Sequence, residues 1–251
     1  MKVISFLNIK GGVAKTTSCV NVAACLGQLG YEVLVIDSDP QANATSSLGM
    51  YNSEGIGMYE LLKGEEQSYI KKTIFKDVYL IPSNIKLIAS EGEILADTKK
   101  PREIRLRKWM NRRDRDFDFI LIDCPPSLGM LTTNALAITD YVLVPIKIDK
   151  YALDGFEYLL SVIDEARENL NVNLRFLGAF ATMDKRTKVN KEIKKDLKNV
   201  IGEKFFEQTV RENADVIKST FEFQPVVYFN PKSNASNDYK ELTKEIVSCL
   251  I

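Results

Sequence analysis

The segment with the clearest capacity for chemistry lies near the N-terminus, between a short apolar run and a predicted helix. It contains Gly11 and Gly12, followed by Lys15 and Thr16. Backbone N–H groups at the start of a helix face an anion, and the helix dipole favours negative charge there. Glycine lets the backbone come close and adopt a positive φ. Lys15 can reach the β- and γ-phosphates of a nucleotide, and the Thr16 hydroxyl can reach Mg²⁺. The segment is therefore predicted to bind nucleotide phosphates.

This loop departs from the strict pattern G-x-x-x-x-G-K-[ST]. Ile9 occupies the position of its first glycine and Ala14 that of its second. On the strict pattern alone, an ordinary turn remains an alternative. Lys10 instead gives the variant K-G-G-x-x-K-[ST], with two lysines. At Ala14 a Cβ is tolerated if φ is negative and costs about 1 kcal/mol or more if φ is positive. The predicted phosphate-binding residues are Lys10, Gly11, Gly12, Val13, Ala14, Lys15, Thr16 and Thr17.

Acidic side chains follow two other predicted strands. Asp37 and Asp39 come after Val33–Ile36, and Asp123 comes after Phe119–Ile122. In open α/β sheets, ligands bind at the carboxyl ends of the strands, so these acids and the glycine-rich turn are expected to share one site. Two carboxylates near phosphates are costly unless a cation lies between them. Capping of the next helix is the alternative for Asp37 and Asp39.

The elements that must position these residues follow a regular pattern. Short apolar runs alternate with amphipathic stretches, which predicts βαβ units in an α/β P-loop fold. The sheet is expected to be twisted and mostly parallel, with helices on both faces, and residues 1–251 are expected to form a single domain. A helix is predicted from Lys15 to Leu29, ended by Gly30. The remaining predictions are strands at Val3–Leu7, Val78–Ile81, Tyr141–Ile146 and Phe176–Thr182, short edge strands at Phe205–Val210 and Val226–Tyr228, and a mostly helical stretch from Asp97 to Asp116.

Composition narrows the function classes. The chain has 251 residues, 45% of them hydrophobic, with a formal net charge of zero and no histidine. Histidine-based catalysis and histidine-ligated metals are therefore excluded. The sequence offers no signal peptide and no apolar run long enough to cross a bilayer, so a cytoplasmic location is expected. Four cysteines without a C-x-x-C pair are interpreted as reduced structural thiols: Cys19, Cys25, Cys124 and Cys249.

Several ordered motifs together resemble the ParA/MinD class of deviant Walker A ATPases, and most of all the short ParA/Soj partition proteins. The resemblance runs almost end to end. It implies a slow Mg²⁺-dependent ATPase for plasmid or chromosome segregation. Such a protein forms an ATP-dependent homodimer, binds DNA non-specifically on the nucleoid, and hydrolyses ATP when a ParB-like partner stimulates it. Besides the loop, the motifs are Asp37–Thr45, Ile122–Leu128, Val144–Ile146, Ala152–Gly155 and Asn230–Ser233.

The resemblance also implies roles for individual residues. Lys10 would be the signature lysine, which reaches the phosphates bound by the other subunit and offsets charge in the transition state. Asp39 would orient the attacking water, and Asp37 would support the loop or the Mg²⁺ shell. Asp123 would hold Mg²⁺, and Asn213 would contact adenine. The implied catalytic set is Lys10, Asp39 and Asp37, and the implied metal set is Thr16, Asp123 and Asp39.

The DNA-binding surface is where the chain departs from the family. Glu212 and Asp215 stand where many short ParA proteins have arginines. Two basic stretches could serve instead, Lys185–Lys204 and Lys99–Arg113, although a run of charge is usually only a solvated face. On a helical projection the first stretch has a lysine face opposite an apolar face that would pack inward. The lysine face is Lys191, Lys194, Lys195 and Lys198, and the apolar face is Ile193, Leu197, Val200 and Ile201.

Three alternatives remain open. A MinD-like division ATPase would need a basic amphipathic C-terminal helix for the membrane. Here the segment Tyr239–Ile251 instead carries an apolar stripe for the sheet to bury, so no membrane partner is expected. A metabolic enzyme of the same class is the second alternative, either an amidoligase or a reductase whose cluster would need a cysteine pair. The third is a nucleotide-dependent scaffold with a partner other than ParB. The stripe consists of Leu242, Ile246, Cys249 and Leu250.

Overall fold

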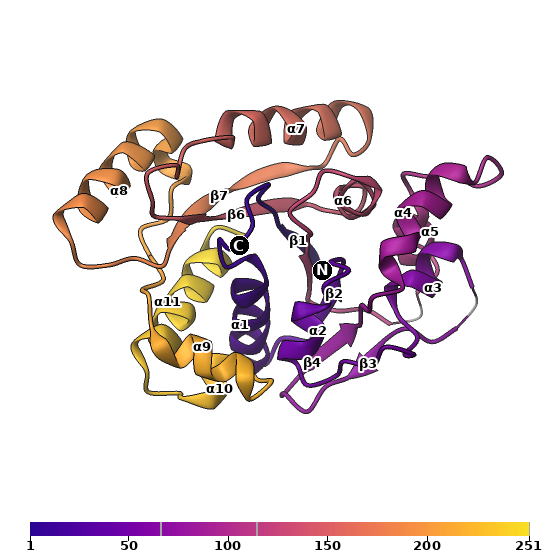
Figure 1. Ribbon diagram of the computed structural model, residues 1–251, viewed down its shortest axis with the longest axis horizontal. Helices are drawn as coiled ribbons and strands as arrows, with labels where there is room; N and C mark the ends of the chain where they lie inside the picture. Colours follow the sequence, from indigo (N-terminus) through magenta and orange to yellow (C-terminus); the bar gives the residue numbers. More distant parts are fainter. Residues whose placement is uncertain (66, 114, 251) are drawn as a thin grey trace.

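The computed structural model describes residues 1–65, 67–113 and 115–250. Its centre is a seven-stranded sheet in the order β3-β4-β2-β5-β1-β6-β7 (Figure 1). Among the described residues, the strand pairs are parallel except β3 with β4, which is antiparallel. The strands are β1 Lys2–Phe6, β2 Val33–Asp37, β3 Lys71–Lys72, β4 Val78–Ile81, β5 Phe119–Asp123, β6 Tyr141–Lys147 and β7 Arg175–Thr182.

Helices cover both faces of this sheet (Figure 1). On one face α1, α2, α10 and α11 share a hydrophobic core with the sheet, and α9 packs at its edge. On the other face α3 to α8 share the second core. The helices are α1 Lys15–Gln28, α2 Asn43–Ser47, α3 Met58–Lys63, α4 Leu87–Ala96, α5 Arg105–Met110, α6 Met130–Leu136, α7 Phe156–Asn169, α8 Lys188–Ile201, α9 Ala214–Phe221, α10 Val226–Phe229 and α11 Asn234–Ser248, with a short 3₁₀ turn η1 at Gly202–Lys204.

Alternation along the strands divides the two cores. In β2, Val33 and Val35 belong to the core under α1, while Leu34 and Ile36 belong to the opposite core. All five β2 residues are buried, as expected for a parallel strand covered on both faces. The predicted mostly parallel α/β fold is therefore confirmed.

Strand register brings the acidic turns together with the phosphate loop. Asp37 at the end of β2 lies beside Asp123 at the end of β5, and Asp123 also pairs with Phe6 at the end of β1. The loop that follows β1 leads into α1. Three neighbouring central strands thus end at one place, which positions the candidate site.

Several expected elements differ in the structure. Val226–Phe229 is a short helix rather than an edge strand. Pro225 precedes it with φ −60°, a value that suits the start of a helix. Val226 and Val227 are buried in the core that includes α1. Of the other expected edge strand, Phe205 makes one isolated bridge to Ala179. The β-propensity of these short apolar runs was overridden by packing.

The basic stretch from Asp97 to Asp116 is also less helical than expected. Within it the described helix is α5, Arg105–Met110. Pro101 restricts the residue before it and cannot continue a hydrogen-bonded helix, which separates α4 from α5. In contrast, the first helix ends at Gln28, and Gly30 adopts φ +94°, so the predicted glycine stop is confirmed.

The C-terminal helix packs largely as expected. Leu242 and Ile246 are fully buried in the core shared with α1. Cys249 was expected in the same stripe but is exposed, because α11 ends at Ser248 and the cysteine lies beyond it. The other three cysteines are buried and free, as expected: Cys19, Cys25 and Cys124. In the described part of the chain, no helix is both long enough and apolar enough to cross a bilayer.

Candidate functional site

The phosphate loop forms the open N-terminus of α1. Gly12 has φ +68° and Ala14 has φ +66°, both in the left-handed region. Ala14 occupies the N-cap position and provides no side-chain cap, so the first amides of α1 are available to an anion. Ala14 thus has the positive φ that is costly for a residue with a Cβ. This strain is a feature expected of a functional loop and costs on the order of 1 kcal/mol.

Lys15 is held at the loop by main-chain contact. Its Nζ donates to the carbonyl oxygen of Lys10 at 2.9 Å, and the residue is 7% exposed. Burial lowers the pKa of Lys15, while the nearby charges of Asp123, Cys124 and Asp39 act in the opposite direction. The ammonium group therefore lies in a partly dry setting, where its attraction to a phosphate is strong.

Asp123 is a buried carboxylate without a well-formed hydrogen bond among the described residues. The residue is 0% exposed, and neither carboxylate oxygen meets a well-formed hydrogen bond among the described residues. Burial raises the pKa of Asp123 well above its usual range, and the neighbouring charge of Asp37 adds to the effect. The Thr16 hydroxyl lies close enough to oppose it. A buried, uncompensated carboxylate beside a threonine hydroxyl fits Mg²⁺, which takes hard oxygen ligands.

Asp39 and Asp37 occupy different environments two residues apart. Asp39 lines the cleft at 8% exposure, and its Oδ1 accepts the amide of Gln41 at 2.9 Å. Asp37 is fully buried, and its Oδ2 accepts both the amide and the hydroxyl of Thr45, at 2.8 and 2.6 Å. Burial raises the pKa of Asp37 to about 6, and the Thr45 hydrogen bonds limit the rise. Asp37 therefore supports the start of α2, and its predicted catalytic role stays a prediction.

Lys10 lies at the rim of the site. Its amide donates to Asn8 Oδ1 at 3.0 Å, and its Nζ donates to the carbonyl oxygen of Tyr151 in the β6–α7 loop. Among the described residues that line the cleft, Lys15 is present and Lys10 is not. The two lysines of the loop thus point to different places.

The loop opens into a cleft of about 660 Å³. Its far wall is formed by Val210–Asn213 and the first turns of α9, including Val216 and Ile217. The wall combines apolar side chains, such as Val216 and Ile217, with the polar segment Arg211–Asn213. Because phosphates would occupy the end at the loop, a nucleoside would lie against this wall. Asn213 lies in the wall as predicted, and its side-chain oxygen caps α9 through the amide of Asp215 at 2.8 Å. A contact between Asn213 and adenine remains a prediction.

Sequence reasoning missed some residues of the cleft. Thr182 ends β7, and its hydroxyl donates to the carbonyl oxygen of Val13 at 3.1 Å, so it braces the phosphate loop. Met183, with φ +53°, Gln41 and Asn43 also line the cleft. Their positions at the end of β7 and between the end of β2 and the first turn of α2 were the available signal, since strand ends face this edge of the sheet.

The basic stretches are less free than the helical projection predicted. In α8, Lys194 turns inward to Asp184 and is 29% exposed, and Val200, expected inside, is 55% exposed. Lys194 and Asn190 donate to the internal carboxylate of Asp184. Of the predicted apolar face, Leu197 is buried and Ile193 and Ile201 pack against the core as predicted. Lys198 pairs with Glu207, whereas Lys191 and Lys195 are exposed.

The Lys99–Arg113 stretch is largely tied to the fold. Arg105 is 8% exposed and pairs with Asp97 at 2.9 Å. Arg107 donates to the carbonyl oxygens of Ala137 and Leu170. Guanidinium groups bound to main-chain oxygens in this way fix α5 in place, which weakens the stretch as a DNA-binding candidate.

Comparisons with known proteins agree with this geometry. A family model described as an AAA domain matches residues 1–176. The sporulation initiation inhibitor protein Soj of Bacillus subtilis is 34% identical over 251 residues, covering 98% of each chain. The chromosome-partitioning ATPase Soj of Treponema pallidum is 35% identical over 250 residues, covering 98% of this chain and 97% of its own. The structure of cobyrinic acid a,c-diamide synthase from Mycobacterium smegmatis, with bound ATP analogue and magnesium, has a TM-score of 0.85 and 30% identity, covering 97% of this chain and 93% of that one.

Proposed function

Because the chain belongs to the ParA/Soj family of P-loop ATPases, we propose that it segregates DNA as an ATP-dependent sandwich dimer. Lys15, Thr16 and the loop amides hold Mg-ATP in their own subunit. Asp123 holds the ion, and Asp39 orients the attacking water. Bound Mg²⁺ supplies charge stabilisation at the phosphates. Residues 1–251 act as one domain, since both hydrophobic cores share one sheet.

The position of Lys10 is the observation that carries the dimer. Lys10 lies at the rim, outside the lining of its own cleft, and its Nζ donates to a main-chain carbonyl, that of Tyr151. A phosphate of a second subunit can replace that carbonyl as the acceptor. Exposed apolar side chains lie near the same carboxyl edge, among them Tyr151 at 56%, Ile85 at 51% and Ile88 at 57%. A second copy placed over this edge would cover them and exclude water from the phosphates, which strengthens electrostatic catalysis.

A mixing experiment tests this proposal. Lys10→Ala removes the lysine offered to the partner, and Lys15→Gln removes the lysine that binds the subunit's own nucleotide. Each variant alone should hydrolyse ATP at a rate close to background. Mixed together, they should recover part of the activity, because the site with an intact Lys15 receives Lys10 from the other subunit. A matched control, Lys150→Ala beside the same rim, should behave like the wild type. No recovery on mixing would reject a Lys10 contribution in trans.

The proposed cargo pathway involves DNA and a ParB-like partner. The ATP-bound dimer binds nucleoid DNA non-specifically, and the partner stimulates hydrolysis and release. Co-sedimentation with DNA in ADP, ATP or a slowly hydrolysed analogue, with and without Asp39→Ala, tests the DNA step. Binding should need ATP, persist in Asp39→Ala and fall steeply with salt. Equal DNA binding with ADP and with ATP would count against a partition function.

The lysines of α8 can be separated in the same assay. Lys191 and Lys195 are exposed and available to phosphates, whereas Lys194 is engaged by Asp184. Reversing Lys191 and Lys195 to Glu should therefore weaken DNA binding more than Lys194→Glu does, when ATP binding is matched by saturating nucleotide. Unchanged DNA binding in the double variant would remove α8 from consideration.

The amidoligase alternative is motivated by the structural match to a diamide synthase. A ligase needs an acceptor substrate next to the γ-phosphate. The second cleft, lined by Tyr141, Arg175 and Lys204 among others, lies where β6 and β7 begin. The phosphate loop lies at the opposite, carboxyl ends of the strands. This cleft lies away from the phosphates and gives the amidoligase alternative no support. The Treponema pallidum relative, at 35% identity, is named a chromosome-partitioning ATPase, so partition is the better-supported function.

A further inference from the structure

The far wall of the cleft is a segment without regular structure that must be fixed by contacts from outside. Val210 donates its amide to Ala181 at 2.9 Å and accepts from the amide of Asp184 at 3.0 Å. Glu212 donates its amide to the carbonyl oxygen of Asp184 at 3.1 Å. The wall segment therefore runs alongside the end of β7, and Asp184 is the residue that it meets there.

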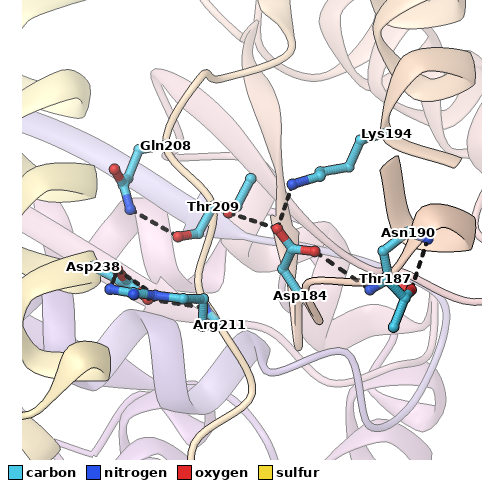
Figure 2. Close-up of polar contacts among 8 residues, drawn as sticks. All are labelled: Asp184, Thr187, Asn190, Lys194, Gln208, Thr209, Arg211 and Asp238. Carbon is cyan, nitrogen blue, oxygen red and sulfur yellow. Dashed lines mark hydrogen bonds and ion pairs between the residues drawn. The ribbon is translucent and has the colours of Figure 1, made fainter. Parts of the chain in front are cut away.

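The Asp184 side chain gathers three further contacts from two other elements (Figure 2). Its Oδ2 accepts the Thr209 hydroxyl at 3.0 Å, directly before the wall, and also accepts Lys194 Nζ from α8. Its Oδ1 accepts Asn190 Nδ2, also from α8, at 3.3 Å. The residue is 8% exposed, so these are hydrogen bonds to a largely desolvated carboxylate. Charge-assisted bonds of this kind are the strong ones.

A second carboxylate holds the wall from the opposite side. Arg211 donates Nε and Nη2 to Asp238 of α11, at 2.8 and 2.6 Å, and its amide donates to the same carboxylate at 3.0 Å (Figure 2). Asp238 is 4% exposed. The wall is thus fixed between α8 and α11 by one buried carboxylate on each side.

We propose that Asp184 is a positioning residue for nucleotide binding. It holds the segment Val210–Asn213 of the far wall in place and joins this segment to the basic helix α8. Asp184 is not among the residues that line the cleft, so it acts through the wall. The phosphate loop is braced by other contacts, from Thr182 to Val13 and from Lys15 to Lys10. Loss of Asp184 should therefore weaken binding of the nucleoside at the far wall of the cleft and leave binding of the phosphates at the loop unchanged. This inference rests on the proposed ATP binding.

The test compares two ligands that share phosphates but differ in the nucleoside. Affinities for ATP and for inorganic tripolyphosphate are measured by displacement of a fluorescent nucleotide from wild type, Asp184→Ala and Thr209→Val. Asp184→Ala should bind ATP roughly tenfold more weakly, the scale of one lost charge-assisted hydrogen bond, and tripolyphosphate within about twofold of wild type. Thr209→Val keeps the side-chain shape and should give a smaller loss of the same kind. Equal losses for both ligands, or no loss for ATP, would overturn the inference.

A matched pair of lysines on α8 tests the connection to that helix. Lys194→Met removes the charge that Asp184 accepts, whereas Lys198→Met removes an exposed pair with Glu207. The KM for ATP should rise several-fold in Lys194→Met with kcat within about twofold, and neither should change in Lys198→Met. Equal effects of both variants would reject a specific link through Asp184. If wild type binds no ATP at all, the proposed function fails; if it binds ATP and Asp184→Ala binds it equally well, only this inference fails.

Discussion

Two buried carboxylates at the same edge of the sheet have opposite surroundings. Asp123, at the end of β5, is 0% exposed and has no well-formed hydrogen bond among the described residues. Asp184, just after β7, is 8% exposed and accepts from Thr209, Asn190 and Lys194. Without a cation the first carboxylate lowers stability, whereas the second joins three elements through its hydrogen bonds.

The difference separates ligand binding from architecture. An unpaired buried charge is expensive, so a fold retains it where something from outside compensates it. A buried carboxylate with all its donors present leaves little for a ligand to add. The surroundings of the two carboxylates therefore support the roles proposed above, Asp123 as a ligand of the nucleotide-bound ion and Asp184 as part of the scaffold around the nucleotide.

Asp123→Asn should give the largest effect. Without the carboxylate, Mg²⁺ is poorly held, and steady-state ATP hydrolysis should fall by at least about 100-fold. Without nucleotide, the raised pKa of Asp123 means that folding costs stability at any pH above the unfolded-state pKa of a carboxyl, which includes pH 7. An amide has no such cost, so the melting temperature should rise by a few degrees at pH 7. Adding Mg²⁺ with ATP should stabilise the wild type far more than the variant. A lower melting temperature of the nucleotide-free variant would break the comparison.

Asp184→Ala should change stability in the opposite direction. It leaves Thr209, Asn190 and Lys194 without their shared acceptor, so the free energy of unfolding should fall by about 2–3 kcal/mol. Urea unfolding without nucleotide measures this. Asp184→Asn keeps one acceptor oxygen and should lose less. A neutral Asp184→Ala would mean that water replaces these contacts, and the two carboxylates would then differ less than their surroundings suggest.

Ala14→Gly extends the comparison from charge to backbone. Ala14 has φ +66°, which glycine adopts without strain, although glycine also gains entropy in the unfolded chain. The free energy of unfolding should rise by roughly 0.5–1 kcal/mol, read from the urea midpoint. Ala42→Gly, at φ +53° outside the phosphate loop, is the control. Because the Ala42 methyl is fully buried and that of Ala14 is not, Ala42→Gly should stabilise less. Only Ala14→Gly should also change ATP affinity.

Lys185→Ala should give the smallest effect. Lys185 pairs with Glu212 at 2.8 Å, but the two side chains are 58% and 53% exposed. Exposed pairs contribute little, so unfolding free energy should stay within about 0.5 kcal/mol of wild type. Lys194→Ala, which removes a partner of a buried carboxylate, should cost more. Similar costs for the two lysines would show that burial is not what distinguishes the Asp184 cluster.

Local motifs made much of the site predictable. The loop residues Lys10 to Thr17 are contiguous, so their chemistry is written in adjacent positions. Asp39 and Asp123 could be placed beside them because a parallel sheet brings its strand ends to one edge. The alternation of short apolar runs with amphipathic stretches likewise predicted the α/β fold, since the central strands bury both faces.

The tertiary structure decided what depends on distant partners. No pattern within α8 shows that Lys194 turns inward, because its acceptor Asp184 lies outside the helix, at the end of β7. The positive φ of Ala14 and the helical state of Val226–Phe229 were likewise set by the loop's path and by packing against α1. The sequence determined which groups could bind Mg-ATP. Packing determined that Asp123 has no well-formed hydrogen bond among the described residues and that Asp184 has three. The reason is that a carboxylate's partners come from the elements that fold against it.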